Sequence, residues 1–342
     1  MQPSASSSAQ RGRSMLRTAM GPAIGSALVD PAVVEIMVNP DGHLWIDRLG
    51  EGRSDTGTIY EAEQIERIIR LVASHARAEI HGNAPIISAE LPPHGEGAGE
   101  RFEGVLPPVS LAPCFSIRKP ASRIYGLTDY VDDGLMSAGI AERLALAVVE
   151  RLNILVVGGT SSGKTTLTNA LLAEMAHLGD RVILIEDTRE LQCAAPDVVA
   201  LRTRPPTGAG GAGVTMADLL RSTLRLRPDR IVVGEVRGPE ALDMLKAWNT
   251  GHPGGIATVH ANGALAALYR LESLVQESVV SVPRRLIAEA IDMIVFIAGR
   301  GRARRVETIA SVRGLDPQGN YEVVDLTPAS PSQPNLPQGD KS

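Results

Sequence analysis

The sequence NILVVGGTSSGKTTL, residues 153–167, decides the fold of this chain. Its first five residues form a largely apolar strand, and the eight residues from Gly158 to Thr165 match the pattern GxxxxGK[ST] at every fixed position. The residues that follow, 164–177, have the apolar spacing of a helix. A glycine-rich turn between a buried strand and a helix N-terminus presents backbone N–H groups to phosphate oxygens. The stretch therefore predicts a nucleotide-binding α/β domain.

This turn supplies the expected nucleotide-binding residues. The Lys164 ammonium group is expected to neutralise β- and γ-phosphate oxygens, and the Thr165 hydroxyl to ligate Mg²⁺. ATP and Mg²⁺ are therefore the expected cofactors. The residues expected to bind the nucleotide are Gly158, Gly159, Thr160, Ser161, Ser162, Gly163, Lys164, Thr165 and Thr166.

Acidic residues follow two further apolar strands. Residues 230–237 read RIVVGEVR, which is the pattern of a Walker B element with Glu235 at the carboxyl end of its strand. Such a carboxylate either holds Mg²⁺ through water or polarises the attacking water. The strand at residues 182–185 is followed in the same way by Glu186. Both glutamates are candidate general bases, and the sequence leaves the choice between them open.

A histidine ends a third strand, in the sequence GGIATVHAN at residues 254–262. With an ordinary pKa of about 6.5, His260 is suited to sense a γ-phosphate or to carry a proton. The alternative is an ordinary hydrogen-bonding histidine at a strand end. Strands and helices alternate from residue 135 to residue 327, which predicts a mainly parallel sheet covered on both faces.

The first third of the chain follows a different pattern. Residues 15–119 combine short strands with a single amphipathic helix at residues 61–77. A β-hairpin is predicted at residues 33–47, where two apolar runs flank the turn sequence NPDG. This region is therefore predicted to be a smaller α+β domain.

Three segments connect or flank the two predicted domains. Residues 120–134 are polar and show no periodicity, so they are predicted to be a linker to the domain at residues 135–327. Residues 1–14 and 328–342 carry too little apolar surface to offset the entropy of ordering, which predicts disordered tails.

The four elements occur in the order found in the secretion superfamily of hexameric ATPases, which this chain resembles. The matching elements are the Walker A turn, an Asp box at residues 185–191 (IEDTREL), the Walker B element, and a His box that ends at residues 258–262 (TVHAN). The resemblance extends from about Val33 to Asp325 and is greatest to the type IV secretion and conjugal-transfer branch, especially the TrbB group. It implies a C-terminal RecA-like P-loop ATPase domain with a smaller α+β N-terminal domain.

The resemblance also implies a function and partners. It implies Mg²⁺-dependent ATP hydrolysis by a hexamer that powers conjugative transfer, type IV secretion or pilus assembly, with inner-membrane channel proteins as partners. Arg101 and Arg118 match arginines that close over the phosphates from the N-terminal domain, although surface arginines of an ordinary sheet are the alternative. The candidate catalytic residues are then Glu235, Glu186, Lys164, Arg118, Arg101 and His260, and the candidate Mg²⁺ ligands are Thr165 and Glu235.

Composition limits the alternative functions. The 342 residues carry a net charge of −5 and only 3% aromatic residues, which counts against a DNA-translocating RecA-like motor. No sequence-specific binding of nucleic acid is therefore expected. A P-loop nucleotide switch or kinase also remains an alternative, because the motifs alone do not name the phosphate acceptor.

Hydropathy and charge indicate where the protein acts. The longest strongly apolar run, residues 291–298, is far shorter than the roughly 20 residues that a membrane helix needs. The start of the sequence lacks the apolar region of a secretory signal, so a cytoplasmic protein is expected. The resemblance implies a peripheral location at the inner face of the inner membrane. A basic run could contact an acidic membrane surface or a partner, with a solvated turn as the alternative. It consists of Arg300, Arg302, Arg304 and Arg305.

Overall fold

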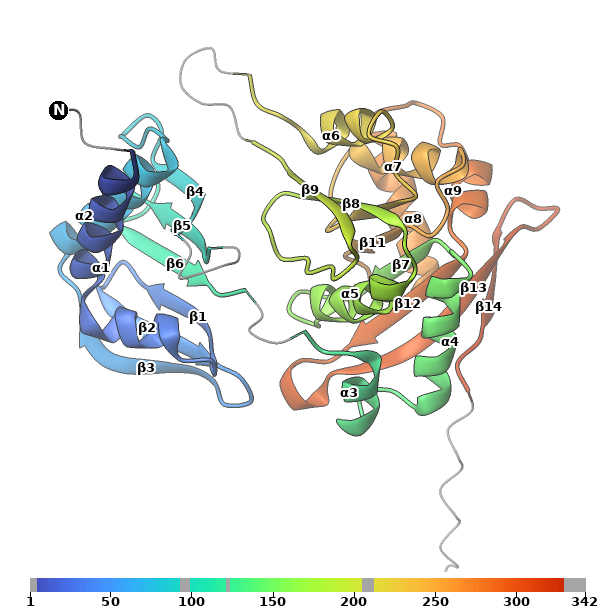
Figure 1. Cartoon of the computed structure of the whole chain (residues 1–342), viewed down its shortest axis with the longest axis horizontal. Helices are drawn as coiled ribbons and strands as arrows, with labels where there is room; N and C mark the ends of the chain where they lie inside the picture. The colour runs from blue at the N-terminus through green and yellow to red at the C-terminus, as the bar shows by residue number, and fades with distance from the viewer. Residues whose placement is uncertain (1–4, 93–98, 121–123, 205–211, 329–342) are drawn as a thin grey trace, which may run out of the picture.

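Two β-sheets, one on each side of the predicted linker, organise the chain (Figure 1). The computed structural model describes residues 5–92, 99–120, 124–204 and 212–328. Its mixed architecture confirms the predicted fold class, an α/β C-terminal domain with a smaller α+β N-terminal domain.

The N-terminal sheet is antiparallel, with its strands in the order β3-β2-β1-β6-β5-β4. These strands are β1 (Val33–Val38), β2 (His43–Arg48), β3 (Gly52–Ile59), β4 (Ile86–Glu90), β5 (Arg101–Val105) and β6 (Cys114–Arg118). The helices α1 (Ala5–Val29) and α2 (Ala62–Ala76) pack against the sheet and against each other. The hairpin and the helix predicted for this region are confirmed. The strand β3 was not predicted, because its mostly exposed residues show no apolar alternation.

The helix α1 corrects one prediction. Disorder is predicted for residues 1–14; the first four lie outside the described residues, but residues 5–14 are helical. Leu16 and Met20, further along α1, are buried in the N-terminal core and anchor the helix. Once anchored, a helix extends through Ser, Ala and Gln at little cost, because propagation needs no new nucleus. Of the second predicted tail, 328–342, all but the first residue lies outside the described part.

The predicted linker at residues 120–134 contains a short helix, α3 (Leu127–Asp132). Leu127 and Tyr130 are buried in the C-terminal core, so this half of the segment packs with the C-terminal domain. A helix of six residues is too short to show an apolar period, which explains why the sequence pattern missed it. Three residues of the segment, 121–123, lie outside the described part.

The C-terminal sheet has the order β14-β13-β12-β7-β11-β10-β8-β9. Its strands are β7 (Ile154–Val157), β8 (Arg181–Glu186), β9 (Asp197–Arg202), β10 (Arg230–Val233), β11 (Ile256–Val259), β12 (Met293–Ala298), β13 (Arg305–Leu315) and β14 (Tyr321–Asp325). The pairs from β12 to β9 are parallel, whereas β13 and β14 add an antiparallel edge. The mainly parallel sheet is therefore as predicted.

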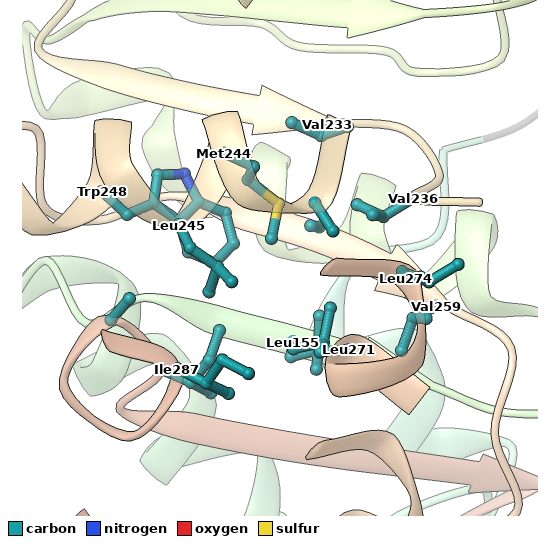
Figure 2. Close-up of a cluster of buried hydrophobic side chains, with 14 of the residues drawn as sticks. Leu155, Val233, Val236, Met244, Leu245, Trp248, Val259, Leu271, Leu274 and Ile287 are labelled. Carbon is teal, nitrogen blue, oxygen red and sulfur yellow. The ribbon is translucent and has the colours of Figure 1, made fainter. Parts of the chain in front are cut away.

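Helices cover both faces of this sheet. They are α4 (Ala138–Val149), α5 (Lys164–Ala173), η1 (Glu174–His177), α6 (Met216–Thr223), α7 (Glu240–Asn249), α8 (Ala264–Gln276) and α9 (Arg284–Ala290). Alternate residues of each central strand point to opposite faces: Leu155 and Val157 to one core, Ile154 and Val156 to the other. Figure 2 shows the first core, where Leu155 of β7 lies among side chains of β10, β11, α7, α8 and α9. The sequence pattern did not single out the helices α4, α8 and α9.

The strand order positions the functional residues. The parallel strands β7, β11, β10 and β8 are neighbours, so their carboxyl ends lie along one edge of the sheet. The phosphate-binding turn follows β7. His260 follows β11, Glu235 follows β10, and Glu186 is the last residue of β8. Ligands of open parallel sheets bind at this edge.

Candidate active site

The phosphate-binding turn has the backbone conformation that its glycines permit. Gly163, which caps α5, has φ +97°, in the left-handed region that favours glycine. At Gly158 a side chain is excluded by close packing, because a Cβ atom would lie 2.4 Å from the carbonyl oxygen of Ile297. The turn is therefore held against β12 on one side and opens into the N-terminus of α5 on the other.

Lys164 is buried at the centre of the turn, with 7% of its surface exposed. Its Nζ donates hydrogen bonds to the carbonyl oxygens of Gly158 (3.1 Å) and Gly159 (3.0 Å). The same atom lies 3.2 Å from Nδ1 of His260. Burial lowers the pKa of Lys164, and Glu235 opposes that shift. The ammonium group is thus held where a β- or γ-phosphate would replace its backbone acceptors.

His260 lies between Lys164 and Glu235. Its Nε2 is 2.7 Å from Oε1 of Glu235, while Arg237 donates a hydrogen bond to Oε2 of the same carboxylate. Burial, and after it the charge of Lys164, lowers the pKa of His260, so its imidazole is neutral at pH 7. The structure therefore brings Lys164, His260 and Glu235 together as a row of contacting side chains.

Glu186 is more deeply buried, with 4% of its surface exposed. Its Oε1 accepts hydrogen bonds from the backbone N–H groups of Glu190 and Leu191, both at 2.8 Å. Burial raises the pKa of Glu186 to about 7, although these two hydrogen bonds oppose the shift. Its side chain also lies beneath Gly234, where a Cβ atom would be 3.0 Å from its Cγ. Glu186 therefore holds the turn of the Asp box in place.

Glu190 is a site residue that the sequence analysis did not single out. Its Oε2 lies 3.4 Å from the Thr165 hydroxyl, and its carbonyl oxygen accepts a hydrogen bond from Asn169 at 3.1 Å. The Asp-box resemblance contained the signal, because Glu190 is the last acid of that box. The motif could not show that this acid, rather than Asp187, turns back to the first turn of α5.

Two arginines approach this edge from the N-terminal sheet. Arg101 and Arg118 are directly opposite each other on β5 and β6. The guanidinium group of Arg101 lies 4.0 Å from Glu190 Oε1, and the charge of Arg118 contributes weakly, after burial, to the lowered pKa of Lys164. A second contact between the sheets joins Arg202 to Glu90 at 2.6 Å. Whether the two arginines act in catalysis stays a prediction.

The donor set fits a magnesium ion that arrives with a nucleotide. Oε1 of Glu235 is buried and has no aligned hydrogen-bond donor in the part of the chain that the structure describes, although Nε2 of His260 lies 2.7 Å away. No cluster of three His, Cys, Asp or Glu side chains suited to a metal occurs among these residues. Mg²⁺ is commonly bound by one or two protein groups together with substrate phosphates. The Thr165 hydroxyl and Glu235 are suited to that role.

The fold and the site together define a RecA-like P-loop ATPase. The family model described as "Type II/IV secretion system protein" matches residues 24–300, and the chain belongs to this family. This confirms the family predicted from the four motifs.

The relatives agree with the conjugal-transfer branch of that family. The chain is 48% identical to the "Probable conjugal transfer protein TrbB" of Sinorhizobium fredii, over 90% of this chain and 91% of the relative. It is 36% identical to the "Type IV secretion system protein PtlH homolog" of Bordetella bronchiseptica, over 83% and 91%. The pilus retraction motor PilT with bound ADP has the same fold, with a TM-score of 0.59, 17% identity and coverage of 90% of this chain and 83% of that structure.

Proposed function

We propose that this chain hydrolyses ATP with Mg²⁺ as the hexameric motor of a conjugal-transfer or type IV secretion apparatus. The observation that carries the proposal is the row of contacts from Lys164 through His260 to Glu235, beside a complete phosphate-binding turn. The similarity to TrbB supports the biological setting.

The residues of the row have separate tasks in hydrolysis. Lys164 exchanges its backbone acceptors for β- and γ-phosphate oxygens and neutralises their charge. Glu235 orients the attacking water and accepts its proton at Oε1, the oxygen without an aligned donor. The neutral imidazole of His260 contacts both groups and is placed to respond to the γ-phosphate. Mg²⁺, when bound, adds charge neutralisation at the β- and γ-phosphate oxygens.

The N-terminal domain completes the site in this proposal. Phosphoryl transfer spreads negative charge over the equatorial oxygens, and an arginine that arrives late stabilises it. Arg101 and Arg118 lie on a separate sheet, joined to the ATPase domain through the segment around residue 120. Hydrolysis would therefore require closure of one domain on the other, which couples the chemical step to movement.

Phosphate release without any acceptor tests the reaction. Purified protein, ATP and Mg²⁺ should release inorganic phosphate without DNA or a second substrate, and EDTA should stop the release. Release only with DNA would indicate a translocating motor, and transfer of the phosphate to an acceptor would indicate a kinase. Nucleotide binding with negligible turnover would indicate a switch.

Assembly and location need separate measurements. Electron microscopy with a non-hydrolysable ATP analogue should show six-fold rings, and another ring size would contradict the hexamer. Among the described residues, the structure contains no helix with the length and apolarity to cross a bilayer. We propose that inner-membrane channel proteins hold the motor at the membrane, so high salt or carbonate should release it. Extraction by detergent alone would contradict this peripheral association.

A further inference from the structure

A cationic side chain outside the predicted site lies directly against the phosphate-binding turn. Arg304 follows the 3₁₀ helix η2 (Gly301–Ala303), in the connection from β12 to β13. A Cβ atom placed on Gly163 would come within 2.8 Å of Arg304 Nε and 2.9 Å of its Cδ and Cζ. The guanidinium end of Arg304 thus packs on the last glycine of the turn, at the N-terminus of α5.

The Nε atom of Arg304 is buried and has no hydrogen-bond partner among the residues that the structure describes. Nε carries one of the N–H donors of the guanidinium group. The neighbouring side chain on α3, Tyr130, is 1% exposed, and its hydroxyl also lacks a hydrogen-bond partner in the described part. A buried donor of a charged group is rarely left unsatisfied. The position of Arg304 Nε beside the phosphate-binding turn indicates that a bound nucleotide supplies the hydrogen-bond acceptor.

The strand order shows which end of a nucleotide Arg304 faces. On one side of β7 lies β11, where His260 contacts the Lys164 ammonium group; this side receives the γ-phosphate. On the other side lies β12, which leads into the turn that carries Arg304. A nucleotide seated across the turn would therefore direct its nucleoside end toward Arg304. Arg304 lies on the flank away from Glu235, so it is not placed to act on the attacking water.

We propose, on the basis of the proposed ATPase function, that Arg304 binds the α-phosphate of ADP and ATP through its Nε–H and so sets nucleotide affinity. Arg304 is thereby distinguished from its neighbour Arg305, which is exposed and pairs with Glu307 at 3.1 Å. The basic run consequently does not act as one surface, because Arg304 turns inward to the phosphate-binding turn.

The variant Arg304→Gln of the full chain tests this assignment. The dissociation constant for ADP and the KM for ATP should rise roughly tenfold or more, because charge-assisted hydrogen bonds are among the strongest. The kcat should stay within about twofold, since the contact is the same in the ground state and the transition state. Arg304→Lys should give intermediate affinity, and the matched control Arg305→Gln should bind ADP as the unmodified protein does.

Inorganic phosphate distinguishes direct binding from support of the turn. Phosphate occupies the turn without reaching the α-phosphate position, so its inhibition constant should be the same for Arg304→Gln and the unmodified protein. A parallel loss of phosphate and ADP binding would mean that Arg304 only supports the turn, and unchanged ADP affinity would mean that it makes no contact. Either result overturns the proposal. An unmodified protein that binds no ADP would instead overturn the proposed function.

Discussion

The two sheets of the molecule differ in how their charged side chains are arranged around the site. At the carboxyl edge of the C-terminal sheet, Lys164, His260, Glu235 and Arg237 contact one another in a continuous series. In the antiparallel N-terminal sheet, Arg101 and Arg118 lie directly opposite each other on neighbouring strands, and Arg101 lies 4.0 Å from Glu190. The like charges gain stability from an anion placed between the sheets. We therefore predict that the C-terminal domain binds the nucleotide and that both domains are needed for turnover.

The largest expected effect tests the C-terminal half of the comparison. Lys164→Ala should abolish hydrolysis, because the lost charge serves the phosphates. Phosphate release should fall below about a tenth of the unmodified rate, while the circular dichroism spectrum and melting temperature stay close to normal. Lys246→Ala, which removes an exposed lysine from α7, is the matched control and should keep full activity. Substantial activity in Lys164→Ala would refute the assignment of the turn.

The second largest expected effect tests whether the N-terminal domain contributes to turnover. Arg118→Ala and Arg101→Ala should each bind ATP nearly normally and turn over roughly 10³-fold more slowly, as expected for loss of an arginine that acts late. Arg67→Ala, on an exposed face of α2 in the same domain, should be without effect. A chain truncated to begin at Gly126, which keeps α3 in the C-terminal core, should likewise bind nucleotide and barely hydrolyse it. Hydrolysis by that truncated chain at the full rate would make the N-terminal domain a docking module only.

A third variant sharpens the assignment within the C-terminal edge. Glu235→Gln keeps the shape of the side chain but cannot accept a proton, so turnover should fall on the order of 10²-fold with ATP binding retained. Glu186→Gln is the matched comparison and should be milder, because the amide oxygen can still accept the hydrogen bonds from Glu190 and Leu191. Single-turnover rates measure both. A larger loss of turnover in Glu186→Gln than in Glu235→Gln would mean that Glu186 is the general base.

The last expected effect is on stability and concerns Glu186 alone. Its pKa is about 7 in the folded protein and 4.5 in an ordinary environment, because burial disfavours the carboxylate. The folded state therefore binds more protons than the unfolded state between these values, and the free energy of unfolding should fall as the pH rises through them. Relative to Glu186→Gln, the unmodified protein should lose on the order of 3 kcal/mol between pH 4.5 and pH 7.

Urea unfolding of both proteins without nucleotide, at several pH values across this interval, gives the comparison. Parallel pH profiles for the two proteins would show that folding leaves the pKa of Glu186 unshifted, which contradicts the prediction. A widening gap in favour of Glu186→Gln would confirm that the fold holds this carboxyl group partly protonated.

The sequence by itself determined the ATPase domain, because its signals are local. The strand, turn and helix of residues 153–167 are consecutive, so a pattern of adjacent residues specifies both the conformation and the phosphate-binding groups. The strands that end at Glu235 and His260 are equally local and were found in the same way. Elements without a strong period, such as β3 and α3, were missed because their short or polar sequences give no pattern.

Only the tertiary structure decided which side chains meet. Sheet order places β12, rather than another strand, beside the turn, and this brings Arg304 onto Gly163 across 141 positions of sequence. Glu190 reaches Thr165, and Glu186 turns inward to hold the Asp box, for the same reason. Motifs specify residue types at fixed spacing, but strand order and burial arise from packing the whole chain. The local sequence therefore specifies the chemical type of each group, while the fold determines its contacting partners and its pKa.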